Sequence, residues 1–267
     1  MALTSIAFGS AIGMVLGLTG AGGGILAVPA LVLGIGLGMA QAMPVALMAV
    51  GGAALLGALD GLRKGLVRYK AAFLMALSGS VVSPLGMWIA HRVSAVWLMT
   101  LFSLVMLIVA ARMLQQACRK SRLQDSTTVQ HKHCMINPAT GKLQWHWKSS
   151  FVLAAVGAVS GLFTGMLGVG GGFLIVPALK HFSNISMHGI VATSLMVIAL
   201  ISTSSVAGAL AAGAQVPIAG WYFIAAAAGG MLAGRLLAPF LRERWLQIGF
   251  ALITTLVSLL LLSRAYF

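Results

Sequence analysis

The chain has 267 residues, of which 60% are hydrophobic and only 7% are charged, and its mean hydropathy is +1.03. An average soluble domain carries about 25% charged residues, so this composition excludes a soluble globular protein. The formal net charge of +14 comes from basic residues clustered in a few loops between apolar runs, which is typical of membrane topology signals and not of nucleic-acid binding. Continuous apolar runs, without the alternation of a β-barrel, predict an all-α polytopic membrane protein.

The first apolar run, at about 3–37, is interrupted by the stretch GLTGAGGGILAVPAL at 17–31. Glycine and proline both disfavour the interior of a helix, so the run is expected to break there. Three uninterrupted apolar segments of spanning length follow, at about 43–60, 70–90 and 95–112. Together these elements form the expected first membrane repeat, residues 1–112.

A polar, basic segment at 113–148 is expected to be a cytoplasmic linker. Its two cysteines, Cys118 and Cys134, offer no disulfide framework. The sequence HKHC at 131–134 has no second ligand pair with zinc-type spacing, so no metal or cofactor is expected. WHW at 145–147 is typical of a membrane-interface anchor.

The second membrane repeat, residues 149–267, has the same order of elements as the first. Its first run, at about 150–180, contains GMLGVGGGFLIVPAL at 165–179, which is identical to 17–31 at ten of fifteen positions. The offset of 148 residues also pairs Gly86 with Gly234 without a gap, which indicates a duplicated unit. Its three further segments lie at about 189–212, 218–238 and 246–263.

The basic residues predict that the two repeats have opposite orientations. The loop at 61–69 is basic, whereas its counterpart at 212–218 carries no charge. If basic loops are cytoplasmic, corresponding loops fall on opposite sides of the membrane, as in an inverted-topology repeat. Each glycine-broken run must then begin and end on one side. We therefore expect each repeat to consist of a helical hairpin of two short arms, with the glycines at its tip, followed by three transmembrane helices.

The glycine tips are expected to bind an anion. Helices that begin just after the glycines direct unpaired N–H groups and the positive end of the helix dipole at the tip. Two inverted hairpins can bring their tips together near the midplane, where transporters of this kind place their substrate. The tip residues expected to contact the anion are Gly22, Gly23, Gly24, Gly170, Gly171 and Gly172. The alternative is close helix packing by small residues, for which Gly13 and Gly17 have helical spacing.

The pattern G-x-G-G-G…V-P-A-L, present in both halves, resembles the TauE/SafE family of sulfite exporters. The stretch VATSLMVIALISTSSVAGAL at 191–210 is similar to the helix that follows the glycine motif in that family. The resemblance covers nearly the whole chain outside the linker. It implies a membrane transporter, not an enzyme, for sulfite, sulfonates or related sulfur compounds. The first half departs from it, with QAMPVALMAVGG at 41–52 in place of the Thr-Ser stretch.

Hydroxyl side chains near the tips are further candidates for substrate contact. Thr193 and Ser194 could donate to an oxyanion, and Thr19 stands beside the first tip. The alternative for each is a hydrogen bond to the carbonyl four residues earlier in its own helix. Four more hydroxyls follow on the same segment at 202–205.

Two charged residues lie in or beside predicted spans. Arg235 is a candidate for anion binding because charges inside a membrane are expensive, although it is near enough to the cytoplasmic end to snorkel. Asp60 is expected to form a local ion pair with Arg63 or Lys64.

These features predict an exporter in a bacterial inner membrane that moves a small sulfur oxyanion (sulfite) or an organosulfonate. Its partners are then the anion and the lipid bilayer, with no nucleic acid, and the oligomeric state stays open. An inside-negative potential favours anion efflux by about 2.3 kcal/mol per charge per 100 mV. Two alternatives remain. One is a passive channel or a cation-coupled uptake carrier, with Na⁺ on carbonyls freed by Pro29 and Pro177. The other is a non-transporting assembly or sensor protein.

Overall fold

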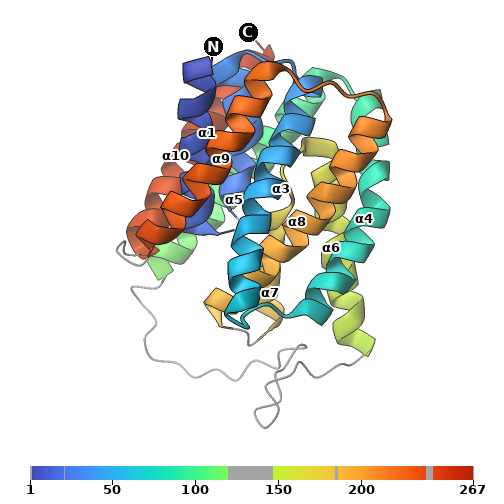
Figure 1. The fold of residues 1–267 in the computed structure, drawn as a ribbon, viewed down its shortest axis with the longest axis vertical. Coiled ribbons are helices and arrows are strands. Elements are labelled where there is room, and N and C mark those ends of the chain that lie inside the picture. The colour runs from blue at the N-terminus through green and yellow to red at the C-terminus, as the bar shows by residue number, and fades with distance from the viewer. Residues whose placement is uncertain (1, 21, 120–146, 184–185, 239–242, 267) are drawn as a thin grey trace.

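The computed structural model describes the chain except for residues 1, 21, 120–146, 184–185, 239–242 and 267, and the described part is a bundle of helices (Figure 1). The first half contains α1 (Ala2–Thr19), η1 (Gly23–Leu26), α2 (Ala27–Pro29), η2 (Ala30–Ile35), α3 (Met39–Arg63), α4 (Tyr69–Arg92) and α5 (Ala95–Arg119). The second half contains α6 (Trp147–Leu167), α7 (Gly172–Phe182), α8 (Met187–Ala211), α9 (Ile218–Leu237) and α10 (Glu243–Tyr266). These bounds agree with the predicted segments to within a few residues at most ends.

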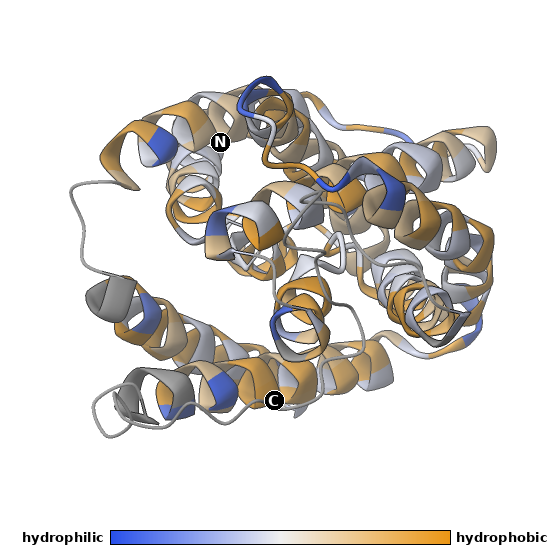
Figure 2. Cartoon of the chain, turned by 90° about the horizontal axis from the view of Figure 1, so that it is seen from below, coloured by the Kyte–Doolittle hydropathy of each residue, from blue (hydrophilic) through white to orange (hydrophobic). Residues whose placement is uncertain are grey.

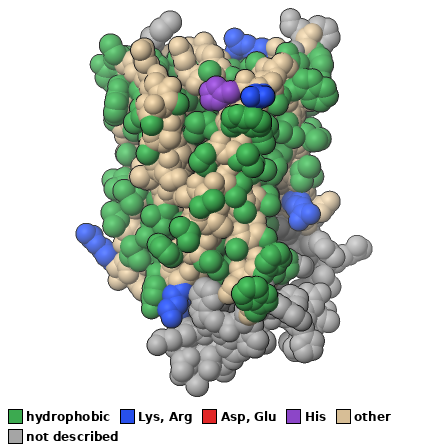
Figure 3. Space-filling model, turned by 90° about the vertical axis from the view of Figure 1, so that its right-hand side faces the viewer, with side chains coloured by type: hydrophobic (Ala, Val, Ile, Leu, Met, Phe, Trp, Pro, Cys, Tyr) green, Lys and Arg blue, Asp and Glu red, His purple; other side chains and the backbone are tan. Residues whose placement is uncertain are grey.

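The surface of the bundle is that of a multi-pass membrane protein. Within the described ranges, seven helices are long and apolar enough to cross a bilayer, namely α1, α3, α4, α5, α6, α8 and α10. The alanine- and glycine-rich α9 has 20 residues but is not among them. Large hydrophobic side chains such as Val81 and Leu236 are more than 70% exposed. Hydrophobic side chains are spread over the face in Figure 3, and Figure 2 shows strongly hydrophilic residues at only a few places along mainly hydrophobic helices.

The chain folds back at both glycine-rich stretches. Gly20 and Gly168, which are equivalent at the offset of 148, have φ values of +76° and +71°, which L side chains rarely adopt. The ring of Phe8 lies against Gly34, so the segment 23–35 runs back along α1. α7, with 11 residues, is about 16 Å long and too short to cross about 30 Å of hydrocarbon. Each broken run therefore folds back as expected. The expectation of two short arms is wrong for the first arm, however, because α1 with 18 residues and α6 with 21 residues are long enough to cross a bilayer.

We call the end of the bundle where α5 ends and α6 begins the linker end, and the end marked N and C the terminal end (Figure 1). α3 and α8 form the centre. Both have 25 residues, begin and end at equivalent positions, and contact each other. Their most apolar windows are 67% and 61% buried, against 28% in α5 and α10. The colour gradient in Figure 1 runs down α3 and up α8, so the two run in opposite directions.

Equivalent helices make reciprocal contacts. α1 packs on α9 and its counterpart α6 packs on α4, while α3 contacts α9 and α8 contacts α4. α5 and α10 pack against each other, and Ser258 Oγ donates to the Ser103 carbonyl at 2.8 Å. A two-fold relation between the halves would produce this pattern. The inverted repeat stays a prediction, which this packing supports.

Glycines set the closest of these contacts. In α1, Gly9, Gly13 and Gly17 lie against the backbone of α9 at Phe223, Ala227 and Met231. In α6, the equivalent glycines Gly157, Gly161 and Gly165 lie against α4 at Met75, Gly79 and Ser83. A methyl group on any of them would collide with a carbonyl of the facing helix. Close packing is therefore the correct interpretation of Gly13 and Gly17.

Candidate functional site

The two glycine tips meet in the centre of the bundle. We call Gly20 with Gly22–Gly24 the first corner, and residues 168–172 the second corner. A methyl group on Gly24 would lie 3.1 Å from the carbonyl oxygen of Val169 and 2.9 Å from Val50 Cγ1. A methyl group on Gly170 would lie 2.9 Å from Ile198 Cγ2 and 3.2 Å from Val50 Cγ1. The corners therefore touch each other, between α3 and α8.

Both corners present backbone donors that the helices cannot satisfy. In the second corner, the N–H groups of Gly172 and Phe173 precede the first hydrogen-bonded turn of α7 and find no acceptor among the described residues. In the first corner, the N–H groups of Gly23 and Gly24 at the start of η1 make no backbone hydrogen bond to a described residue, and residue 21, three positions before Gly24, lies outside the described residues. All four residues are buried. Unpaired N–H groups at a helix start attract negative charge.

Ser202 adds a side-chain donor at the same place. Its hydroxyl is buried, with only 1% of the residue exposed, and it makes no hydrogen bond within the described part of the chain. Ser202 Oγ lies 3.5 Å from the positions that a methyl group would take on Gly51 and on Gly170. From the sequence, Ser202 is only one of four hydroxyl residues at 202–205 and not a separate candidate. Its equivalent in the first repeat is Ala54, so one side of the centre is polar and the other is not.

Two further hydroxyls, which the sequence analysis missed, fix the second corner. Ser160 Oγ donates to the Gly171 carbonyl at 3.0 Å, and Thr164 Oγ1 donates to the Ser160 carbonyl at 2.8 Å. The equivalent positions in the first repeat are Ile12 and Leu16, which pack as apolar side chains. Comparing the two halves position by position would have revealed this difference.

The three predicted hydroxyl contacts all have backbone partners. Thr193 Oγ1 accepts a hydrogen bond from the Arg68 N–H at 3.1 Å, which ties α8 to the start of α4. Ser194 donates to the Ile190 carbonyl at 2.8 Å, and Thr19 donates to the Val15 carbonyl at 2.7 Å. Thr19 Oγ1 is also 3.7 Å from where a methyl group on Gly22 would lie, so Thr19 does stand beside the first corner.

Arg235 is held in an ion pair between the two halves. Its Nη2 lies 2.8 Å from Asp60 Oδ2, and its Nη1 donates to the Gly57 carbonyl at 2.6 Å. The expected pair between Asp60 and Lys64 is present at 2.9 Å. Arg235 shares this carboxylate, which the sequence does not predict, because nothing in the residue spacing shows that α9 lies against α3. The cluster lies toward the linker end, where α3 ends.

Comparison with known proteins supplies the family. Residues 5–261 match the family model described as "Sulfite exporter TauE/SafE". The chain belongs to the TauE/SafE family. It is 32% identical over 197 residues to a "Probable membrane transporter protein" of Xylella fastidiosa, which covers 73% of this chain and 69% of that protein. It is 27% identical over 194 residues to the "Probable membrane transporter protein y4hK" of Sinorhizobium fredii, covering 72% and 71%. No solved structure matches.

These names are those of membrane transporters and not of enzymes. This TauE/SafE chain is therefore a multi-pass membrane transporter with a small-molecule substrate. The expected metal-free linker is not tested, because 131–134 lies outside the described residues, as do Cys134 and most of 113–148.

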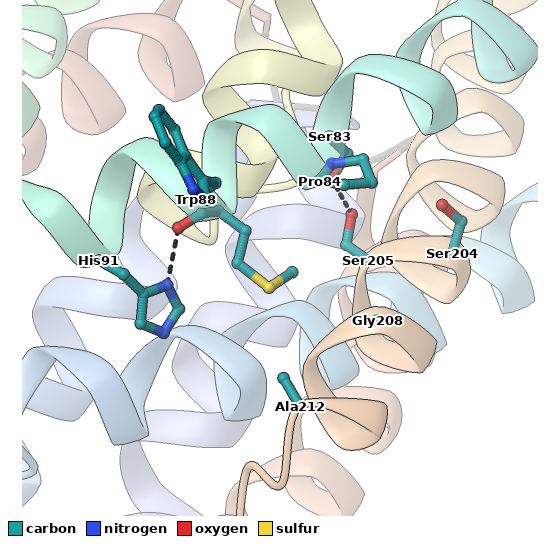
Figure 4. A pocket seen from close by; sticks show the side chains of 9 residues that line it. Ser83, Pro84, Trp88, His91, Ser204, Ser205, Gly208 and Ala212 are labelled. Atoms are coloured by element: carbon teal, nitrogen blue, oxygen red, sulfur yellow. Dashed lines mark hydrogen bonds between the residues drawn. The ribbon is translucent and has the colours of Figure 1, made fainter.

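A cavity of about 260 Å³ opens in this TauE/SafE transporter between α4 and α8, toward the terminal end (Figure 4). Ser83 and Ser205 lie at its inner end, where their hydroxyl oxygens are 2.6 Å apart, and Ser205 also donates to the Ile201 carbonyl. His91 lies near its outer end, with Nδ1 2.7 Å from the Met87 carbonyl. The remaining lining residues are Pro84, Met87, Trp88, Ser204, Gly208 and Ala212.

Proposed function

We propose that this transporter exports a small sulfur oxyanion, such as sulfite, or an organosulfonate, and binds it between the two glycine corners. The observation that supports this most directly is the buried, unpartnered hydroxyl of Ser202 beside Gly170. Leaving such a group unpaired costs about 1–3 kcal/mol, and an anion that accepts its hydrogen bond would offset that cost. In this proposal the six tip glycines contact the anion through their backbone, from Gly22 to Gly24 and from Gly170 to Gly172.

The site has the chemistry of an oxyanion site without a fixed counter-charge. Backbone N–H groups at Gly24 and Gly172 and the hydroxyl of Ser202 are all donors. The whole sequence contains three acidic residues, Asp60, Asp125 and Glu243. The carboxylate of Asp60 is paired with Arg235 and Lys64, so its negative charge is balanced and does not repel a bound anion.

The side chains of Val50 and Ile198 lie against the corners. In this proposal the structure is therefore a closed form of the transporter. Substrate binding requires the corners to separate from these two side chains. In an inverted repeat, two groups of helices can rock against each other and expose a fixed central site to each side in turn. The pairing of α1 with α9 and of α6 with α4 makes each hairpin arm move with a helix of the opposite half.

The proposed direction follows from charge. An inside-negative potential expels an anion with about 2.3 kcal/mol per charge per 100 mV, and uniport needs no coupling residue. We place the linker in the cytoplasm, because the loop at 61–69 and the linker carry most of the basic residues. Thr193, Ser194, Thr19 and Arg235 remain proposed contacts of the anion on its path.

Flux in proteoliposomes tests this proposal. Purified protein is reconstituted with radiolabelled sulfite or a short sulfonate inside, and an inside-negative potential is imposed with a potassium gradient and valinomycin. We expect efflux that increases with the potential and that does not need a Na⁺ gradient. Efflux that requires Na⁺ would favour a cation-coupled carrier. No flux of any sulfur oxyanion under any gradient would refute the proposal.

A further inference from the structure

The cavity between α4 and α8 has a closed counterpart on the other side of the molecule. The offset of 148 residues that relates the two halves places Ser83, Met87, Ser205 and Gly208 opposite Met231, Arg235, Gly57 and Asp60. The offset of 148 residues holds in the structure near these residues. α3 and α8 end at equivalent positions, and each is followed by a glycine with positive φ, Gly65 and Gly213. The two regions can therefore be compared residue by residue.

In the counterpart between α3 and α9, the equivalent residues are in contact. Arg235 binds the Gly57 carbonyl and the Asp60 carboxylate. The methyl end of Met231 would lie 2.6 Å from a methyl group on Gly57. The space between α4 and α8 is a cavity near the terminal end. The equivalent space between α3 and α9, toward the linker end, is filled by a guanidinium, a carboxylate and a methionine side chain.

All three charged residues of this cluster have uncharged counterparts in the cavity wall. Met87 stands in place of Arg235, Gly208 in place of Asp60 and Ala212 in place of Lys64. The two sides therefore differ in sequence as well as in shape. An ion pair that bridges α9 and α3 can hold one side shut, while the other side has no such bridge.

The cavity walls are mainly apolar but include polar groups that can bind an anion. None of its nine lining residues is acidic, and four carry hydroxyl or imidazole groups, namely Ser83, Ser204, Ser205 and His91. Near its mouth, the guanidinium of Arg92 lies 4.3 Å from the centre of the Trp88 ring. A positive charge beside the opening raises the local concentration of anions.

We propose that this cavity is the anion's vestibule on the terminal side of the membrane, and that the Arg235–Asp60 pair closes the equivalent vestibule on the linker side. When the linker side opens, α9 separates from α3, and the guanidinium of Arg235 exchanges the Asp60 carboxylate for the transported anion. This inference rests on the proposed function, because it gives the route to the same central site.

Cysteine accessibility tests it at two equivalent positions. Cys118 and Cys134 are replaced by serine, and Ser204→Cys in the cavity is compared with Leu56→Cys, its equivalent on the closed side. The probe is 2-sulfonatoethyl methanethiosulfonate, a small anion that does not cross lipid, offered to both faces of the vesicles. We expect Ser204→Cys to react and a short alkylsulfonate, which does not consume the reagent as nucleophilic sulfite would, to slow that reaction. If the closed side is open for about a tenth of the time or less, the labelling rate of Leu56→Cys should be at most about one tenth of the rate of Ser204→Cys.

Removing the bridge should open the second vestibule. Asp60→Asn is expected to bring the labelling rate of Leu56→Cys close to that of Ser204→Cys. Lys64→Gln is the matched control, because it removes the other partner of Asp60 and leaves the pair with Arg235. In Lys64→Gln the Leu56→Cys thiol should stay protected.

Two results would overturn the inference. If Ser204→Cys reacts with the lipid-permeant N-ethylmaleimide but not with the anionic reagent, the cavity is filled by lipid. If Asp60→Asn leaves Leu56→Cys protected, the ion pair does not close that side. Sulfite flux is measured in a separate portion of the vesicles that is not treated with the thiol reagents. If transport is present and either of these two results is obtained, only the proposal about the vestibules is refuted. Loss of flux in the unmodified protein would instead refute the proposed function.

Discussion

Replacing Ser202 with alanine should change stability and substrate affinity in opposite directions. The hydroxyl is buried and unpartnered, so its removal takes away an unsatisfied group and breaks no hydrogen bond of the closed form. We expect the free energy of unfolding to stay the same or to rise by about 1 kcal/mol. A hydrogen bond to a charged group contributes about 1.5–3 kcal/mol, so the Kd for sulfite should rise about 10- to 100-fold.

The two effects are measured on one preparation in detergent. Thermal unfolding is followed by intrinsic tryptophan fluorescence, and sulfite binding is followed by calorimetry. Ser258→Ala is the matched control, because Ser258 is equally buried but donates to the Ser103 carbonyl in the α5–α10 pair. It should lower the unfolding temperature and leave the Kd unchanged. If Ser202→Ala lowers stability as Ser258→Ala does, and the Kd does not change, the assignment of Ser202 to the binding site is wrong.

Three other substitutions address the corners, the helix packing and Arg235. Gly171→Val should abolish sulfite flux in proteoliposomes, because Gly171 has a φ of +62° and a side chain there would collide with Ser160. Gly52→Val is the control and should transport normally, because a side chain on Gly52 would point into open space. Gly161→Leu should reduce the yield of folded protein in size-exclusion chromatography, because its added side chain meets the backbone of Gly79 in α4; a normal yield would contradict the packing. Arg235→Gln should raise the Km for sulfite efflux, and an unchanged Km would remove the guanidinium from the path.

Much of the fold could be predicted because it follows from local chemistry. The apolar runs set the positions of α3, α4, α5, α8, α9 and α10, and the repeated glycines set the breaks before η1 and α7. The offset of 148 residues proved to be a structural register, since α3 and α8 begin and end at equivalent residues. These features depend on hydropathy and backbone preference, which a sequence displays directly.

The site was harder to predict because it depends on which side chains are already satisfied. The sequence favours Thr193 and Ser194 as anion contacts, yet each hydroxyl has a backbone partner, while Ser202 has none among the described residues. Similarly, the sequence places Arg235 as a charge inside a span, but its pairing with Asp60 depends on how α9 crosses α3. Which polar groups have hydrogen-bond partners, and how the helices cross, are properties of the assembled bundle, so the residue pattern alone does not display them.

The glycine-lined contact between α1 and α9 also constrains how the protein is made. The surface of α1 that carries Gly9, Gly13 and Gly17 finds its partner only in a helix synthesised about 200 residues later. At a translation rate of about 5–20 residues per second, the first helix waits roughly 10–40 seconds before that partner emerges. During this time its exposed backbone groove must be shielded by lipid or by the insertion machinery. Neither half can therefore complete its own packing alone, and a chain truncated after the first repeat should be recognised as incomplete and degraded.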